Sequence, residues 1–169
     1  MKYGYIVEKL RHNKEVFASL LAEVSEEEYM WKQSEEKWCL LEIVCHLRDE
    51  EVEDFLTRVK YTLLTPHIPP PPINPQAWVK ERTYLEQDYN MVLKKFLNER
   101  DQSVNWLQSL NNPQWDNNFV HPKHGPRTAS MYLANWLAHD YHHIRQINRL
   151  QYDYLKNISR EDLSYAGNW

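Results

Sequence analysis

The chain has 169 residues, a net charge of −4 and 42% hydrophobic residues, a composition typical of a folded protein with a hydrophobic core. No block of basic residues is available to bind nucleic acid, and no run of about 20 apolar residues could span a membrane, so we expect neither partner. With only 3 glycines, a turn-rich β-sandwich or barrel and a glycine-rich phosphate loop are both disfavoured.

The sequence shows no internal repeat and no domain boundary, and we predict a single helical domain over residues 1–169. The segment at the amino terminus is too polar for a signal peptide. The two cysteines, Cys39 and Cys45, do not have the spacing of a zinc ribbon or a redox pair. We therefore expect a cytoplasmic protein with reduced thiols.

Apolar residues recur with a helical period in the first part of the chain. The first predicted helix covers residues 5–24, and a short connection begins with the sequence SEEEY at Ser25. The second predicted helix covers residues 40–64. The apolar positions of the first helix are Ile6, Leu10, Phe17, Leu20 and Leu21.

The sequence TPHIPPPPINP, residues 65–75, interrupts the helical pattern, because its prolines exclude a helix and favour an extended connection. A third helix is predicted over residues 78–110, followed by a second break at residues 111–126 and a fourth helix over residues 128–155. Four long amphipathic helices predict an all-α four-helix bundle, whose long connections leave room for a crossover topology or a loop over a pocket. The core positions of the third helix are Leu85, Tyr89, Val92, Leu93, Phe96, Leu97, Val104 and Leu107.

Three histidines lie within five residues in the sequence HDYHHIRQI of the fourth helix. With about 100° per residue, His139 and His143 fall about 40° apart inside the apolar arc of the helix, whereas His142 falls outside it. Two histidines at this spacing can bind one metal ion, as in helical zinc sites. A pair of hydrogen-bonded core histidines would leave the same pattern.

Asp140 also falls within the apolar arc, where a carboxylate is costly unless it has a partner. It could accept the free N–H of a ligand histidine, or it could form a buried ion pair with an arginine such as Arg100. A third metal ligand should come from another helix. His46 is one candidate, but it shares its helix face with acidic residues and the pattern alone does not select it; the others are His12, His67, His121 and His124.

The segment KWCLLEIVCHLRDEE carries Trp38, Glu42, His46 and Leu47 in the pattern W-x3-E-x3-H-L. In this pattern it resembles the DinB-like family of metal-binding four-helix bundles, and two further segments strengthen the resemblance. The family's other pattern is matched in HPKHGPRTASMYLANWLAHDYHHIRQI by Gly125, Thr128, His139, His143, Gln146 and Ile147. FLNER, which ends in Arg100, resembles the family's third helix. One departure is Cys39, where the family usually has the better helix-capping residues Ser or Thr.

The resemblance implies that His46, His139 and His143 are the three ligands of one divalent metal. Three neutral imidazoles leave the ion its full charge and open positions, which is typical of catalytic sites. Zinc or nickel is the expected metal, and iron also accepts imidazole ligands. Asp140 and Glu42 are candidates for supporting the ligands, and no general base stands out. The roles of His121, His124 and His142 stay open.

Some members of the resembled family transfer or activate low-molecular-weight thiols. We therefore expect a metal-dependent enzyme, either a thiol S-transferase or a hydrolase, acting on a small-molecule substrate. The alternative is a metal-stabilised bundle that is not catalytic and acts by forming a homodimer or binding a protein partner. A zincin-like peptidase is disfavoured because Asp140 stands where those enzymes need glutamate. A di-iron bundle is disfavoured because paired Glu-x-x-His motifs are lacking.

Overall fold

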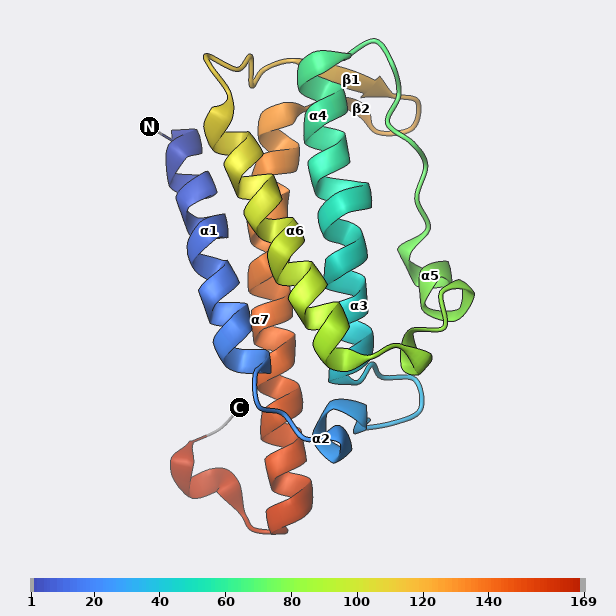
Figure 1. Cartoon of the computed structure of the whole chain (residues 1–169), viewed down its shortest axis with the longest axis vertical. Coiled ribbons are helices and arrows are strands. Elements are labelled where there is room, and N and C mark those ends of the chain that lie inside the picture. Colours follow the sequence, from blue (N-terminus) through green and yellow to red (C-terminus); the bar gives the residue numbers. More distant parts are fainter. Residues whose placement is uncertain (1, 168–169) are drawn as a thin grey trace.

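Four long helical rods run through residues 2–167, the part of the chain that the computed structural model describes (Figure 1). The second rod is continuous, but its middle is a π-helix at Glu50–Leu56. The predicted all-α four-helix bundle is confirmed. The rods are α1 (Lys2–Leu21), α3 with α4 (Leu40–Asp49 and Thr57–Leu64), α6 (Tyr89–Ser109) and α7 (Ala129–Ser159).

The order of the rods explains the long connections. Helix α1 packs against α6 and α7, and the α3–α4 rod also packs against both of these helices. The α3–α4 rod and α6 run in the same direction, so the chain between them has to return along the bundle (Figure 1). The proline-rich residues 65–74 make most of this return without forming a helix, as predicted. The bundle therefore has a crossover connection rather than four consecutive antiparallel helices.

A layer of polar side chains divides the hydrophobic core into two clusters. On α1, Asn13 lies between Leu10 of one cluster and Phe17 of the other. The same order is found on every rod. Glu51 lies between Leu47 and Phe55, Arg100 between Phe96 and Val104, and Asp140 with His143 between Leu137 and Ile147. The four rods thus bring one polar level to the middle of the bundle.

The predicted helix over residues 78–110 is wrong in its first part, which is broken into separate pieces. Helix α5 spans Pro75–Glu81, a 3-10 turn spans Tyr84–Glu86, and α6 begins at Tyr89. The break follows from the positive φ of Thr83 and from Asp88, whose carboxylate accepts a hydrogen bond from Met91 N and caps α6. Leu85 consequently lies outside the core, with 43% of its surface exposed.

Short elements occupy the two segments predicted as irregular. Ser25 caps a five-residue helix, α2 (Glu26–Met30), in the first connection. The break before α7 contains an antiparallel hairpin of β1 (Asn118–His121) and β2 (Gly125–Thr128). Two four-residue strands with a proline are too short to give a recognisable alternating pattern.

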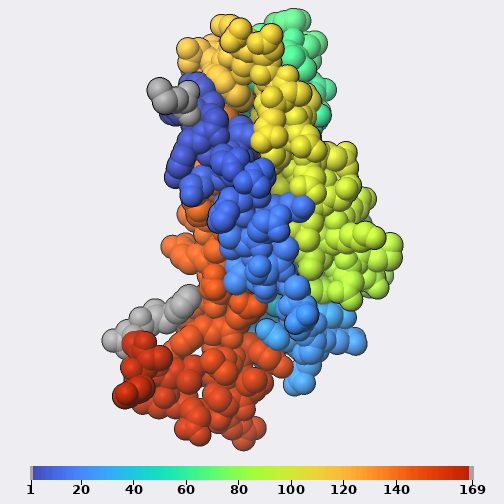
Figure 2. Space-filling model, turned by 60° about the vertical axis from the view of Figure 1, so that its left-hand side comes forward, coloured from blue at the N-terminus to red at the C-terminus, as the bar shows by residue number. Residues whose placement is uncertain are grey.

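Helix α7 is longer than the predicted helix, and its last turns extend beyond the end of α1 (Figures 1 and 2). At the end of α1, the side chain of Gln151 donates to Leu20 O at 2.8 Å, and one turn further along α7 the ring of Tyr154 meets the ring of Trp31 edge to face. The second contact holds the connection after α1 against α7. In residues 2–167, no helix is both long and apolar enough to cross a membrane.

Candidate metal centre

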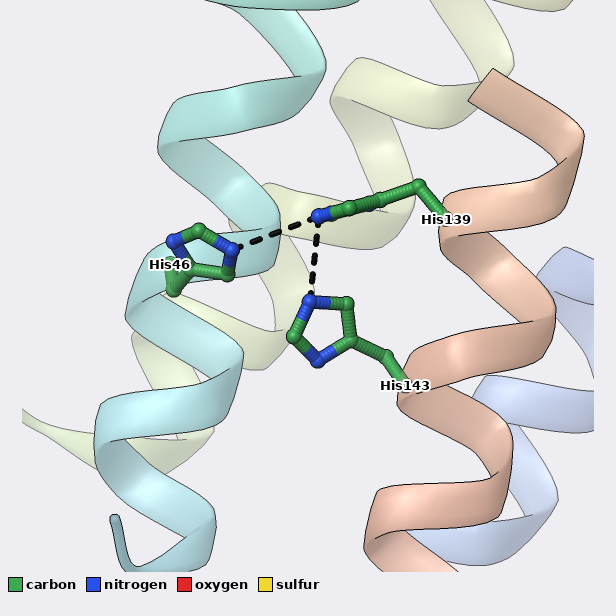
Figure 3. Close-up of side chains that lie close together, drawn as sticks. All are labelled: His46, His139 and His143. Atoms are coloured by element: carbon green, nitrogen blue, oxygen red, sulfur yellow. Dashed lines mark hydrogen bonds between the residues drawn. The ribbon is translucent and has the colours of Figure 1, made fainter. Parts of the chain in front are cut away.

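The side chains of His46, His139 and His143 converge between α3 and α7 (Figure 3). His139 Nε2 lies 3.3 Å from His46 Nε2 and 3.0 Å from His143 Nε2. One ligand atom from each ring lies within 4.8 Å of the other two. Nitrogens that share a tetrahedral metal lie about 3.3 Å apart when each bond is about 2.0 Å, so these three rings fit one ion.

His139 and His143 meet because they are one helical turn apart on α7. His143 is buried, His139 is partly buried and His142 is exposed, in agreement with the predicted phase of the helix. His46 comes from α3, a helix whose side chains are buried on nearly every side, among them Leu41, Val44 and Leu47. The ring of Trp38 covers the ring of His46, with centroids 4.9 Å apart.

Burial keeps all three imidazoles neutral. It lowers the pKa of His46 to about 3, with a smaller contribution from the neighbouring His143. Burial also lowers the pKa of His139 to about 2 and that of His143 to about 4. Neutral imidazoles with converging nitrogen atoms are the form that binds a divalent metal. The donor set therefore suits zinc, nickel or iron.

The acids around His46 belong to the interior and not to a solvated face. Glu42 caps α3, because its carboxylate accepts a hydrogen bond from Cys39 N at 2.9 Å, and it also forms an ion pair with Lys32 at 2.8 Å. This explains how α3 begins at Leu40 although its capping residue is a cysteine. The described contacts of Glu42 give it a structural role at this helix end.

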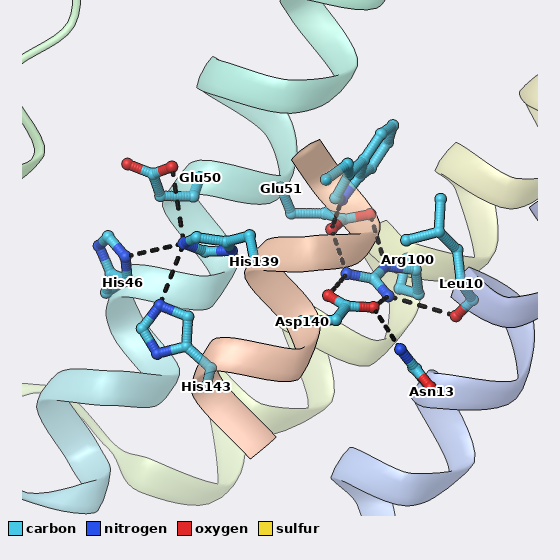
Figure 4. A network of polar contacts seen from close by, with 10 residues as sticks. Leu10, Asn13, His46, Glu50, Glu51, Arg100, His139, Asp140 and His143 are labelled. Carbon is cyan, nitrogen blue, oxygen red and sulfur yellow. Dashed lines mark hydrogen bonds and ion pairs between the residues drawn. The ribbon is translucent and has the colours of Figure 1, made fainter. Parts of the chain in front are cut away.

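Asp140 forms the buried ion pair with Arg100, one of the two arrangements that the sequence allows (Figure 4). The guanidinium of Arg100 also binds the carboxylate of Glu51, at 2.9 and 2.8 Å. Asn13 donates to Asp140 at 3.0 Å, and the Trp136 indole donates to Glu51 at 3.0 Å. Asp140 follows His139 in the chain, so this network holds in place the residue next to a candidate ligand.

Glu50 is an acid near the histidines that the sequence interpretation did not select. The residue is buried, and its Oε2 lies 3.9 Å from His139 Nε2. Burial raises the pKa of Glu50 to about 8, and the negative charge of Asp54 adds to the rise. The signal that could have found it is its spacing, since Glu50 follows His46 by one helical turn.

Two hollows lie on either side of His142, which lines both. The smaller, about 350 Å³, also contains His139, Arg58 and Arg127 in its wall. The larger, about 470 Å³, is lined by Trp38 and carries more basic than acidic side chains. Its charged residues are Lys37, Arg145, Arg149 and Asp153.

His121 and His124 lie at the tip of the β-hairpin, with ring centroids 4.6 Å apart. They do not belong to the group formed by His46, His139 and His143. The adjacent strand β2 supplies Arg127 to the smaller hollow. The hairpin thus contributes to the surroundings of the centre through that residue.

Comparison with known proteins shows the fold and the family of the chain. No curated protein matches the chain. Among solved structures, the chain is similar to YfiT from Bacillus subtilis, described as a probable metal-dependent hydrolase with an unusual four-helix bundle topology. The TM-score is 0.78 at 18% identity, over 89% of this chain and 86% of YfiT, which shows a shared fold. The family model described as the DinB superfamily matches residues 9–147. The chain belongs to the DinB superfamily.

Proposed function

We propose that the protein is a divalent-metal-dependent enzyme in which His46, His139 and His143 bind the ion. The observation that carries this proposal is the convergence of three neutral imidazoles, in which His46 Nε2 lies 3.3 Å and His143 Nε2 lies 3.0 Å from His139 Nε2. A divalent ion bound there would supply a Lewis acid that lowers the pKa of a coordinated thiol or water. Zinc and nickel are the ions that we favour.

The chain's own residues suit a small polar substrate. His139 lines the smaller hollow, so a molecule bound there would lie against a metal ligand. Arg58 and Arg127 outnumber the one acid of that wall, Asp54, so the hollow would favour an anionic group. Phe55 gives the wall an apolar side and packs against the ring of His139, with centroids 4.8 Å apart.

Two reaction classes fit such a site, and both are proposals. One is transfer of a low-molecular-weight thiol to an electrophilic acceptor, and the other is hydrolysis of a small molecule. YfiT is described as a probable hydrolase, which supports the second class. The family resemblance seen in the sequence supports the first.

Metal content after purification tests the metal-binding part of the proposal. The protein should hold about one equivalent of metal per chain, and His46→Ala should lose it. His142→Ala is the matched control, because this exposed histidine lies next to the centre without joining it. Loss of metal in His142→Ala together with retention in His46→Ala would overturn the proposed ligand set.

An assay panel tests catalysis. The metal-loaded protein is incubated with thiols and electrophilic acceptors, and separately with small esters and amides. Turnover that disappears in His46→Ala supports an enzyme. Turnover of a thiol with an acceptor would indicate a transferase, and turnover of an ester or amide would indicate a hydrolase. Stoichiometric metal with no turnover would favour a metal-stabilised bundle that acts by self-association, and light scattering would then test for a homodimer.

A further inference from the structure

The second rod carries four buried acids in its first part, and three of them have a basic partner. Glu42 pairs with Lys32 and Glu51 pairs with Arg100, each at 2.8 Å. Asp49 pairs with Arg48 at 2.7 Å and with Arg82 at 2.8 Å. Each of these carboxylates is therefore compensated in the interior, as a buried charge requires.

Glu50 is the exception. Within residues 2–167, no lysine or arginine forms an ion pair with it, although its side chain is 7% exposed. Its charged neighbours on its own rod are Asp49, Asp54 and Arg58, and Arg58 forms its ion pair with Asp54. The facing group on α7 is His139, whose Nε2 lies 3.9 Å from Glu50 Oε2 (Figure 4). A buried carboxylate that forms no ion pair with a lysine or arginine therefore lies beside the histidine cluster.

The spacing of these residues places Glu50 with the histidines. His46 and Glu50 are one turn apart on the second rod, as His139 and His143 are on α7. Each rod thus carries an i, i+4 pair of possible ligands, and Glu50 approaches the cluster from the side of His139, outside the group of three histidine nitrogens that lie within 4.8 Å of one another. Two ligand atoms of a tetrahedral ion lie about 3.4 Å apart when the bonds are about 2.1 Å long, so Glu50 Oε2 has to move only about 0.5 Å closer to His139 Nε2 to share an ion with it.

The next residue shows that this orientation is specific. Glu51 turns to the other side of the rod and binds Arg100 and Trp136 in the centre of the bundle. The π-helix begins at Glu50, and π turns occur frequently at functional sites. Two adjacent glutamates are therefore divided between the ion-pair network and the histidine cluster.

We propose that Glu50 is a fourth ligand of the metal, so that the centre binds the ion with three nitrogen atoms and one carboxylate oxygen. This inference rests on the proposed metal site, and it changes the character of that site. One carboxylate reduces the charge of the centre from +2 to +1. The donor set then suits ions that accept both imidazole and carboxylate, such as zinc, nickel and iron.

Metal titration of Glu50→Gln tests the proposal. The protein is freed of metal with a chelator, and zinc affinity is measured by calorimetry in competition with a chelator of known affinity. Glu50→Gln keeps the size of the side chain, and it should weaken zinc binding by about tenfold or more. Glu53→Gln is the matched control, since this exposed residue of the same π-helix pairs with Arg82 and should bind zinc like the parent.

Cobalt serves as a second, spectroscopic probe. The visible absorption of bound Co²⁺ depends on its ligands, so the spectrum of Glu50→Gln should differ from that of the parent and of Glu53→Gln. Equal zinc affinity and an identical cobalt spectrum in Glu50→Gln would overturn the inference. If Glu50→Gln does not fold, a crystal structure of the zinc-loaded parent decides, because a ligand oxygen must lie about 2.0–2.2 Å from the ion.

The two proposals fail in different ways. If the parent binds no metal, or if His46→Ala binds metal normally, the proposed metal site itself is wrong. If metal binding depends on His46 but not on Glu50, the metal site stands and only the fourth ligand is refuted.

Discussion

Arg100 and Asp140 form a doubly hydrogen-bonded ion pair in the middle of the bundle, with contacts of 2.7 and 2.8 Å. Both side chains are almost completely buried, and Glu51 binds the other side of the guanidinium. Because Asp140 follows His139 directly, this ion pair fixes the turn of α7 that carries the histidines. The stability of the bundle and the geometry of the candidate centre therefore depend on the same residues.

Replacing Arg100 with methionine should destabilise the protein strongly. The change leaves the carboxylates of Asp140 and Glu51 buried without a cation, and breaking a buried pair in this way costs about 3–5 kcal/mol. Urea denaturation of the metal-free protein measures the loss. Arg145→Met, at an exposed position on α7, should stay within about 0.5 kcal/mol of the parent. Equal stability of the two variants would contradict a structural role for the ion pair.

The metal itself should stabilise the fold. An ion that binds only the folded chain adds about 4 kcal/mol when its free concentration is a thousand times its Kd, so chelation should lower the melting temperature. In His143→Ala the difference between metal-loaded and chelated samples should vanish. In His142→Ala the difference in melting temperature should persist, and its loss in this variant would contradict the proposed ligand set.

The two cysteines should make the protein sensitive to alkaline pH. Burial raises the pKa of Cys39 to about 11 and that of Cys45 to about 12, from an ordinary value of 9.0. Well below pH 9 the thiols are protonated in the folded and unfolded chains, so they do not change the free energy of unfolding. Above pH 9 the unfolded chain ionises first, and the free energy of unfolding should fall as the pH rises toward about 11.

Urea denaturation across this pH range measures the effect. Buried tyrosines with raised pKa act in the same direction, so the comparison is made with a variant that has alanine at Cys39 and Cys45. The parent should lose more free energy of unfolding than this variant. Rapid labelling of both thiols in the native protein near neutral pH would show that they are open to solvent, and it would contradict the prediction, which depends on their burial.

The start of α6 offers a test of the break that divides the third predicted helix. Asp88→Ala removes the carboxylate that accepts from Met91 N at 2.7 Å, and it should cost about 1 kcal/mol. Glu86→Ala, two residues earlier and also exposed, is the control. If the two variants have the same stability in urea, the cap does not determine where α6 begins.

The sequence predicted the rods because their apolar periodicity is local information. It also predicted which histidines of α7 face inward, since His139 and His143 differ from His142 only in helical phase. His46 could not be selected from its helix pattern, because its acidic neighbours look solvated in isolation. Their partners Lys32, Arg82 and Arg100 come from other segments and are brought together only by folding.

The missed elements have a similar cause. The break before α6 depends on the backbone of Thr83 and the cap at Asp88. Apolar periodicity is judged over many residues and does not detect a break at one or two positions. The hairpin at β1 and β2 has strands of four residues, shorter than the window in which alternation becomes clear. Glu50 could not be selected from the sequence, because an acid one turn from His46 has the same pattern as the acids of a solvated helix face.

The polar level that divides the core has a consequence for folding. Asn13 of α1 donates to Asp140 of α7 across 127 positions of the chain, and Arg100 joins both helices to the second rod. During synthesis, α1 therefore leaves the ribosome long before the carboxylate that it binds. The polar level is completed only after α7 is available, and we expect slower folding than in bundles whose neighbouring helices follow one another in the chain.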